Sequence, residues 1–508
     1  MPPDTAERLD LRLVPAAGTA WAVTAAGITW TVGPLLAMLC AATGFGWWAL
    51  DRRCGPTRPA VRAARAAVLG AAVVGAGFAL AAGMRSDAVR GHPLAQRFGT
   101  VATVTVTPGE DPRLLGNGRL MFRGTLEAVD GNEGSGRVLV FAPASGFAGL
   151  SAGQPARFKA RVNRPDRRDL TVAVLNATGR PALGAASPIQ RAARAVRTRF
   201  AETARGVLPS DQAAILPGLV LGDTSAVSAA TTAQFRTAGL THLTAVSGAN
   251  VTIVCGAVLL SAQIVGPRAA VILAAVALAG FVIVVQPSAS VLRAVVMGAI
   301  TLMAMLSARR RQAIPVLAAT VLGLLLVAPQ LAVDVGFALS VCATAALVVL
   351  APVWSRRLTA RGWPKPLADA ICVALAAQLV TAPLVAAISG RVSLIGVLAN
   401  LAVAVVIAPI TVLGTAAAAV CWLWPPAGGL MIRFTGPELW WLLRVAESAA
   451  ALPGAAVPVP AGPVGVVLVG VATVVAAALW RALVRRRRYA VAGSSGDVDY
   501  GWPASDPG

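Results

Sequence analysis

The chain has 508 residues, of which 56% are hydrophobic and only 13% charged, and its mean hydropathy is +0.71. This composition excludes an ordinary soluble domain. The formal net charge of +22 comes almost entirely from arginine, since Lys159 and Lys365 are the only lysines. Arginine collects in the cytoplasmic loops of membrane proteins, so topology explains part of this excess. The remainder fits a polyanionic partner, and charge alone leaves nucleic acid and anionic lipid open.

Two apolar runs near the N-terminus, 21–50 and 68–84, are long enough to cross a bilayer as helices. The segment between them, 51–65, is rich in arginine, which predicts that it is cytoplasmic. The second span therefore emerges on the outer side near Arg85. Residues 1–20 hold both acids and arginines and predict no cleavable signal.

Apolar and polar residues alternate from Arg97 to Leu183, a pattern typical of strands. Five short strands separated by turns such as 130–136 predict a small β-barrel, for which an OB-fold is the best-known form. Because this segment follows the second span, we expect the barrel outside the membrane. Its phenylalanines either stack on the bases of a single strand or fill the barrel core, and their alternation favours the core.

Ser187 and Pro188 open a predicted helix that continues to residue 207. Apolar residues follow one side of this helix, and arginines lie on the others. This pattern predicts an amphipathic helix on the membrane surface, bound to anionic headgroups in preference to DNA.

Beyond Leu208 the chain is apolar almost to its end. Three basic clusters, 309–311, 356–365 and 485–488, are expected in the cytoplasm. The run 392–424 contains Pro409, which predicts a hairpin or a broken helix. The expected spans are 240–265, 269–285, 291–307, 314–328, 331–353, 367–388, 392–424 and 464–484.

These patterns predict a polytopic α-helical membrane protein with a small extracytoplasmic OB-like β-barrel domain near the N-terminus, located in the cytoplasmic membrane. The expected divisions are 1–20 as an N-terminal segment, 21–84 as two transmembrane helices, 97–183 as the barrel, 187–207 as the interfacial helix, 208–484 as a second transmembrane domain, and 485–508 as a basic cluster with a disordered cytoplasmic tail.

Polar residues within the apolar segments are the candidate functional residues, because such side chains are costly in lipid unless they face a partner or a watery cavity. Each also has a structural explanation: Asp223 can cap a helix, His242 can be a hydrogen-bonded core residue, and Arg293 can pair with Asp334. As a group they predict the lining of a polar passage. The candidates are Asp223, Arg236, His242, Ser247, Gly248, Asn250, Arg293, Asp334, Gln378 and Asn400.

The segment 221–254, LGDTSAVSAATTAQFRTAGLTHLTAVSGANVTIV, resembles the signature of ComEC-type competence proteins. Further blocks of that family are similar to SVLRAVVMG at 290–298, to 333–352 and to 377–409, and the resemblance covers about 208–484. It implies a channel that passes one DNA strand through the inner membrane during natural transformation. At Ala249 and Asn250 the sequence departs from a Leu-His pair that many members have. The residues at family-motif positions are Asp223, His242, Ser247, Gly248, Arg293 and Asp334.

Many members of that family also carry a metallo-β-lactamase-like nuclease domain. With His92 and His242 as its only histidines, this sequence predicts no such dinuclear metal site, no cofactor and no enzyme activity. Neither lysine lies in a GxxxxGK loop, so no ATPase is expected either. The resemblance therefore implies separate partners: a DNA receptor, a cytoplasmic helicase or ATPase, and a nuclease, besides single-stranded DNA and membrane lipid.

Two other functions are compatible with the same residues. Broken helices and polar groups at mid-membrane also suit a secondary transporter of a small anionic solute. An intramembrane hydrolase would need Ser247 activated by His242. Five positions on one helix place those two side chains on different faces, which disfavours the hydrolase.

Overall fold

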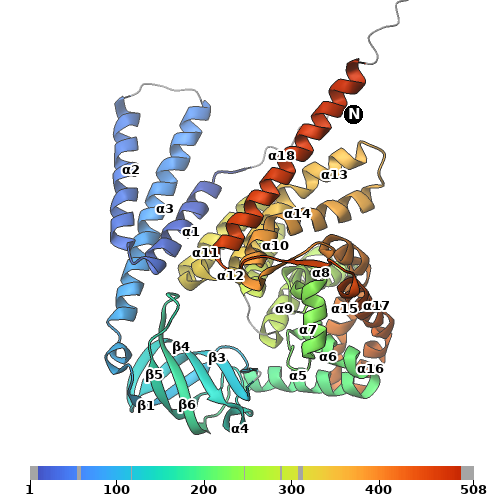
Figure 1. Cartoon of the computed structure of the whole chain (residues 1–508). Helices are drawn as coiled ribbons and strands as arrows, with labels where there is room; N and C mark the ends of the chain where they lie inside the picture. The colour runs from blue at the N-terminus through green and yellow to red at the C-terminus, as the bar shows by residue number, and fades with distance from the viewer. Residues whose placement is uncertain are drawn as a thin grey trace, which may run out of the picture.

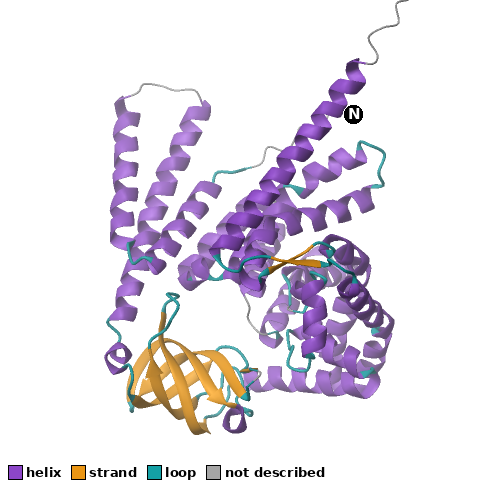
Figure 2. Ribbon diagram, viewed as in Figure 1, coloured by secondary structure: helices purple, strands orange, loops and turns teal. Residues whose placement is uncertain are grey.

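The computed structural model describes residues 10–53, 59–115, 117–244, 246–285, 289–306 and 313–493. Helices make up most of this part of the chain, and the strands gather mainly in one barrel (Figure 2). Five helices are long and apolar enough to cross a membrane, and several shorter apolar helices accompany them. The protein is therefore a polytopic helical membrane protein with a small β-barrel. The five are Ala64–Arg97, Pro267–Val284, Val335–Thr359, Lys365–Ser389 and Gly396–Leu423.

Three helices precede the barrel: α1 (Val14–Thr29), α2 (Gly33–Arg53) and α3 (Pro59–Arg90). The prediction of one helix over 21–50 is wrong, because the chain turns between α1 and α2 at Thr31, whose φ is 58°. At this turn α2 approaches α3 very closely. A Cβ on Gly33 would lie only 2.7 Å from the Ala79 carbonyl oxygen, so this packing requires glycine.

The barrel consists of β1 (Val101–Pro108), β3 (Arg119–Val129), β4 (Asn132–Pro143), β5 (Ala156–Asn163) and β6 (Thr171–Leu183). Its strands form a closed ring in the order β1–β5–β6–β4–β3–β1, in which only the β4–β6 pair is parallel. This five-stranded ring agrees with the OB-like barrel predicted from the alternation of residues. Smaller elements complete it: η1 (Pro93–Arg97), β2 (Arg113–Leu114) and α4 (Ala144–Phe147).

Aromatic rings fill the interior of the barrel. Phe122, Phe147 and Phe158 are buried, and the rings of Phe147 and Phe158 meet edge to face with centroids 5.2 Å apart. This confirms the core interpretation for these three phenylalanines. Phe141 differs, because it is only half-buried on the outward side of β4, where the Arg119 guanidinium lies 5.7 Å from its ring centroid.

The rest of the chain is helical apart from two short strands that pair with each other. The expected break in 392–424 is wrong: α15 runs continuously through Pro409. The expected span 240–265 is also shorter, because α8 begins only at Gly248. The elements are α5 (Pro188–Val207), α6 (Ser210–Leu221), α7 (Ala229–Thr237), η2 (Thr241–Leu243), α8 (Gly248–Ser261), η3 (Ala262–Val265), α9 (Pro267–Val284), α10 (Ala289–Leu306), α11 (Ala313–Val327), η4 (Pro329–Val333), α12 (Val335–Val349), α13 (Ala351–Thr359), α14 (Lys365–Ser389), β7 (Arg391–Ser393), α15 (Gly396–Leu423), α16 (Pro425–Phe434), α17 (Gly436–Ala451), β8 (Ala456–Pro458) and α18 (Pro463–Gly493).

Helix α5 lies across the end of the membrane helices, next to the barrel (Figure 1). Its start was predicted correctly: the Ser187 hydroxyl accepts a hydrogen bond of 3.2 Å from the Gln190 amide. Its apolar side, which includes Phe200 and Ala204, is buried against α6, α15 and α16. The amphipathic pattern therefore arises from packing on protein, whereas the sequence had indicated packing on lipid.

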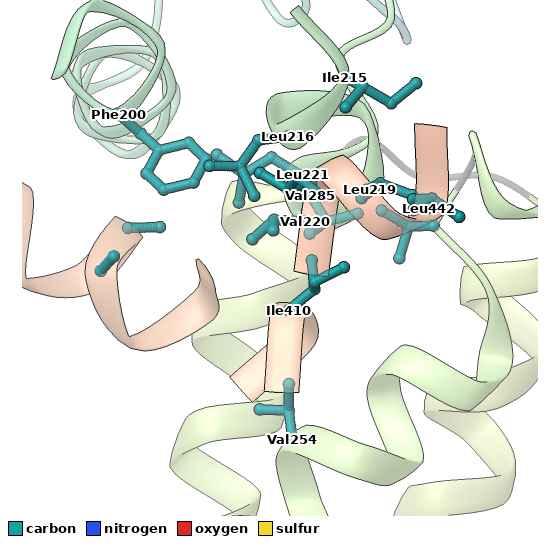
Figure 3. Close-up of a cluster of buried hydrophobic side chains, with 14 of the residues drawn as sticks. Phe200, Ile215, Leu216, Leu219, Val220, Leu221, Val254, Val285, Ile410 and Leu442 are labelled. Carbon is teal, nitrogen blue, oxygen red and sulfur yellow. The ribbon is translucent and has the colours of Figure 1, made fainter. Parts of the chain in front are cut away.

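A core cluster of apolar side chains joins α5 and α6 to the membrane helices (Figure 3). Phe200, Leu216 and Val220 meet Ile410 of α15 and Leu442 of α17 in this cluster. Each fully buried side chain of this size contributes about 1.5–3 kcal/mol to stability. The cluster thereby packs α5–α10 and α15–α17 together.

The described ends that carry basic clusters lie together. The C-terminal end of α2, the α13–α14 turn and the C-terminal end of α18 are all at the end of the molecule opposite the barrel (Figure 1). This arrangement agrees with one common side for 51–65, 356–365 and 485–488. The cluster 309–311 lies outside the described residues.

Candidate functional site

The buried side-chain amide of Asn250 connects the start of α8 to the end of α6 through hydrogen bonds. The Ser247 hydroxyl donates a hydrogen bond of 3.1 Å to Oδ1 of Asn250, and Nδ2 of Asn250 donates one of 2.8 Å to the Leu219 carbonyl. Asn250 is only 6% exposed. Its two bonds satisfy polar groups that would otherwise be buried without partners.

Arg293 of α10 lies beside this helix start and is only 7% exposed. Its Nε donates a hydrogen bond of 2.7 Å to the Ser340 hydroxyl of α12, and Nη1 lies 3.2 Å from Sδ of Met297. Among the described residues, no carboxylate forms an ion pair with this guanidinium. Burying a cation among neutral groups costs free energy, and the binding of an anion would offset that cost.

Gly248 lets the Arg293 side chain approach the backbone of α8. A Cβ at position 248 would lie 2.5 Å from Nη2 of Arg293, so any larger residue must displace the guanidinium. The first amides of a helix also carry partial positive charge. Arg293 and the α8 N-terminus thus place two positive features together inside the helical domain.

A second polar cluster lies where α7 ends and α15 begins. A Cβ on Gly239, whose φ is +73°, would lie 3.0 Å from Cα of Gly396, and the exposed His242 follows three residues later in η2. Nε2 of Gln378 donates a hydrogen bond of 3.1 Å to the Ser393 carbonyl. Nδ2 of Asn400 donates one of 2.8 Å to the Gly396 carbonyl. His242, Gln378 and Asn400, distant in sequence, are therefore gathered around one junction.

Three sequence candidates belong to neither cluster. Asp223 accepts a hydrogen bond of 3.0 Å from the Ser225 amide, and Asp334 caps α12 by accepting one of 2.7 Å from the Phe337 amide. Both carboxylates thus have local structural roles. Arg236 is exposed on α7. The suggested Arg293–Asp334 ion pair is wrong, because Arg293 bonds to Ser340 and Asp334 to the backbone of its own helix.

The arrangement also argues against a serine hydrolase. The Ser247 hydroxyl donates its hydrogen bond to Oδ1 of Asn250. A nucleophilic serine needs a base within hydrogen-bond reach, and this geometry supplies an amide oxygen in its place.

Sequence reasoning missed Ser340 and the joint at Arg197. Nη2 of Arg197, on α5, lies 3.3 Å from the Asp111 carboxylate of the barrel, and its Nη1 donates a hydrogen bond of 2.9 Å to the Val284 carbonyl of α9. Arg197 is only 8% exposed. One arginine thereby ties the barrel, α5 and a membrane helix together. A serine inside an apolar helix and an arginine in an arginine-rich helix carry no signal that singles them out.

The comparisons with known proteins bear on the helical domain. A family model described as Competence protein matches residues 219–484, more than half of the chain, and this range contains both polar clusters. Neither the comparison with curated proteins nor that with solved structures found a match. On the strength of the family model, the chain belongs to the ComEC family of competence proteins.

Proposed function

We propose that this protein is a channel that passes a single DNA strand across the cytoplasmic membrane during natural competence. The observation that carries the proposal is the Arg293 guanidinium, which is buried beside the N-terminus of α8 within the family-matched segment and has no carboxylate partner in the described part of the chain. Its fork of N–H donors suits phosphate oxygens, which it can bind in bidentate fashion.

A phosphate at this position would form an ion pair with Arg293 and accept hydrogen bonds from the backbone amides at the start of α8. Gly248 keeps that backbone accessible, and the Ser247–Asn250 pair holds its orientation. Because Arg293 is buried, α8 and α10 must separate before a strand can reach it. The second cluster, His242 with Gln378 and Asn400, supplies polar side chains that can form hydrogen bonds with the strand without binding it tightly.

Passage of a polyanion through such a site needs partners. We expect a separate DNA receptor outside the membrane, a cytoplasmic helicase or ATPase to draw the strand inward, and a nuclease for the other strand. Membrane lipid surrounds the exposed apolar faces, such as that of α18 with Val467, Val471 and Val474.

The test is uptake of labelled DNA into a DNase-protected form by a deletion strain. The strain is complemented with wild type or with His242→Ala, and membrane levels are checked by immunoblot. Uptake restored by wild type and reduced by the variant supports the channel. Uptake that survives the deletion contradicts a DNA role, and transport of a small anionic solute then becomes the better explanation, since a buried arginine suits that ligand as well.

A further inference from the structure

Three cations stand in a row on the outer surface of the barrel. Arg157, Lys159 and Arg161 alternate along β5 with buried residues, and all three side chains are exposed. Residues two apart on a strand lie about 6.7 Å from each other, on one face. The chain has only two lysines, and one of them is in this row.

The strands that flank this row contain no opposing charge. β1 and β6 pair with β5 on either side, and neither contains Asp or Glu. Thr103 and Thr178 pair with Lys159, and Thr105 pairs with Arg157, so the neighbouring positions offer hydroxyl groups. Glu127, on the next strand beyond β1, is hydrogen-bonded to Thr107. The row is thus a positive surface bordered by hydrogen-bonding groups.

The positive surface continues onto α5. Arg157 pairs with Ala182 at the end of β6, and α5 begins at Pro188, a few residues later. On α5 the exposed Arg191, Arg194 and Arg205 lie outside the buried face, with Glu202 as the only acid of that helix. The Arg194 guanidinium also donates a hydrogen bond of 3.2 Å to the Gly149 carbonyl of the barrel, which fixes the two elements side by side.

We infer that the β5 row and the exposed arginines of α5 form one track that binds the phosphate backbone of a DNA strand and leads it from the barrel toward the membrane helices. This inference rests on the proposed function and names a docking surface for the same substrate. The phosphate backbone supplies most of the affinity of sequence-independent binding, so a row of cations without base-reading groups suffices.

The position of the track favours DNA over lipid headgroups. The barrel lies beyond the ends of the membrane helices (Figure 1), and the buried side of α5 is the side that packs on those helices. The exposed arginines of α5 lie outside the side that packs on the membrane helices. The track also differs from the surface that OB barrels commonly use, which here is the β3–β4 face with Arg119, Arg123 and Phe141.

The test measures binding of a fluorescent single-stranded 20-mer of thymidine to the full chain in nanodiscs of zwitterionic lipid, by anisotropy at several salt concentrations. The variant is Arg157→Gln/Lys159→Gln/Arg161→Gln, whose side chains are exposed. Each lost phosphate contact lowers the slope of log affinity against log salt by about 0.7 for single strands, so the slope should fall by about 2. The dissociation constant should rise about 10- to 100-fold at 0.1 M salt.

Two further variants make the result specific. Arg356→Gln/Arg357→Gln/Arg361→Gln removes the same charge at the opposite end of the molecule and should bind as wild type does. Arg119→Gln/Arg123→Gln should also change binding little. Unchanged binding by the β5 variant, loss only in the β3–β4 variant, or no binding by wild type would overturn the track.

Binding to vesicles that contain anionic lipid tests whether the β5 row contacts lipid headgroups. Should the β5 variant lose vesicle binding while keeping oligonucleotide binding, the row is a lipid contact and the inference is wrong. DNA uptake by cells reports separately on the proposed function, because a channel with normal uptake and no oligonucleotide binding at β5 would leave that function standing.

Discussion

Replacing Arg293 by methionine distinguishes a transport role from a structural one. A guanidinium buried among membrane helices costs about 2.5–3.5 kcal/mol relative to an apolar side chain. Its charged hydrogen bond to Ser340 returns about 1.5–3 kcal/mol. The free energy of unfolding of Arg293→Met should therefore stay close to the wild-type value or rise by up to about 2 kcal/mol. DNA uptake, in contrast, should be lost, because the methionine cannot bind a phosphate.

Two measurements on the same variant decide between the roles. Thermal unfolding in nanodiscs, followed by tryptophan fluorescence, reports stability, and the DNase-protection assay reports uptake. Arg236→Met is the matched control, since it removes an arginine that is exposed on α7 and should leave uptake intact. Arg293→Lys keeps the charge without the fork of donors and should retain only part of the uptake.

The reasoning fails if Arg293→Met unfolds more easily than wild type by several kcal/mol, because the arginine would then be a structural residue. It fails equally if the variant is stable and takes up DNA normally.

Three other substitutions follow from the same contacts. Gly248→Ala would place a methyl group 2.5 Å from Nη2 of Arg293, so uptake should fall at least about tenfold at normal membrane level, a loss worth about 1.4 kcal/mol or more. Asn250→Leu leaves the buried Leu219 carbonyl without its donor, so the unfolding free energy should drop by about 1–3 kcal/mol in a thermal melt. Arg197→Met removes the Arg197–Asp111 ion pair that holds the barrel to α5, so amide exchange at Ala152, whose N–H bonds to Asp111, should accelerate.

Local patterns predicted the barrel and the start of α5 well. The alternation of residues in β5 marks buried and exposed positions directly, and Ser187 followed by Pro188 is a local capping signal. Such features depend on neighbouring residues only, so the sequence contains them in full.

Features that depend on tertiary contacts were beyond the sequence. The turn at Thr31 accompanies the close approach of Gly33 to α3, and no local residue announces it. Pro409 reads as a helix breaker, yet α15 continues through it, since neighbouring helices in a membrane domain can hold such a helix together. The apolar side of α5 predicts burial, and periodicity cannot say whether lipid or protein covers it.

The sequence named candidate residues but could not show how they pair. Ser247, Gly248, Asn250 and Arg293 were all candidates, and the structure brings them together with Ser340 as the partner of Arg293. A charged residue in an apolar segment shows that a partner is needed, but local sequence does not identify that partner. Asp334 was one possible partner of Arg293, and in the structure it caps α12.

The most direct test of the account is to ask whether a DNA strand in transit touches the Arg293 site. A photo-crosslinking residue replaces Met297, whose sulfur lies beside the guanidinium, and a control replaces Val276, which is 63% exposed on the apolar α9. Labelled DNA is stalled during uptake by a bulky protein at its trailing end, and the cells are irradiated. The account predicts a crosslink at position 297 and none at 276. Equal labelling at both positions, or labelling at neither while stalled uptake is confirmed, would contradict it.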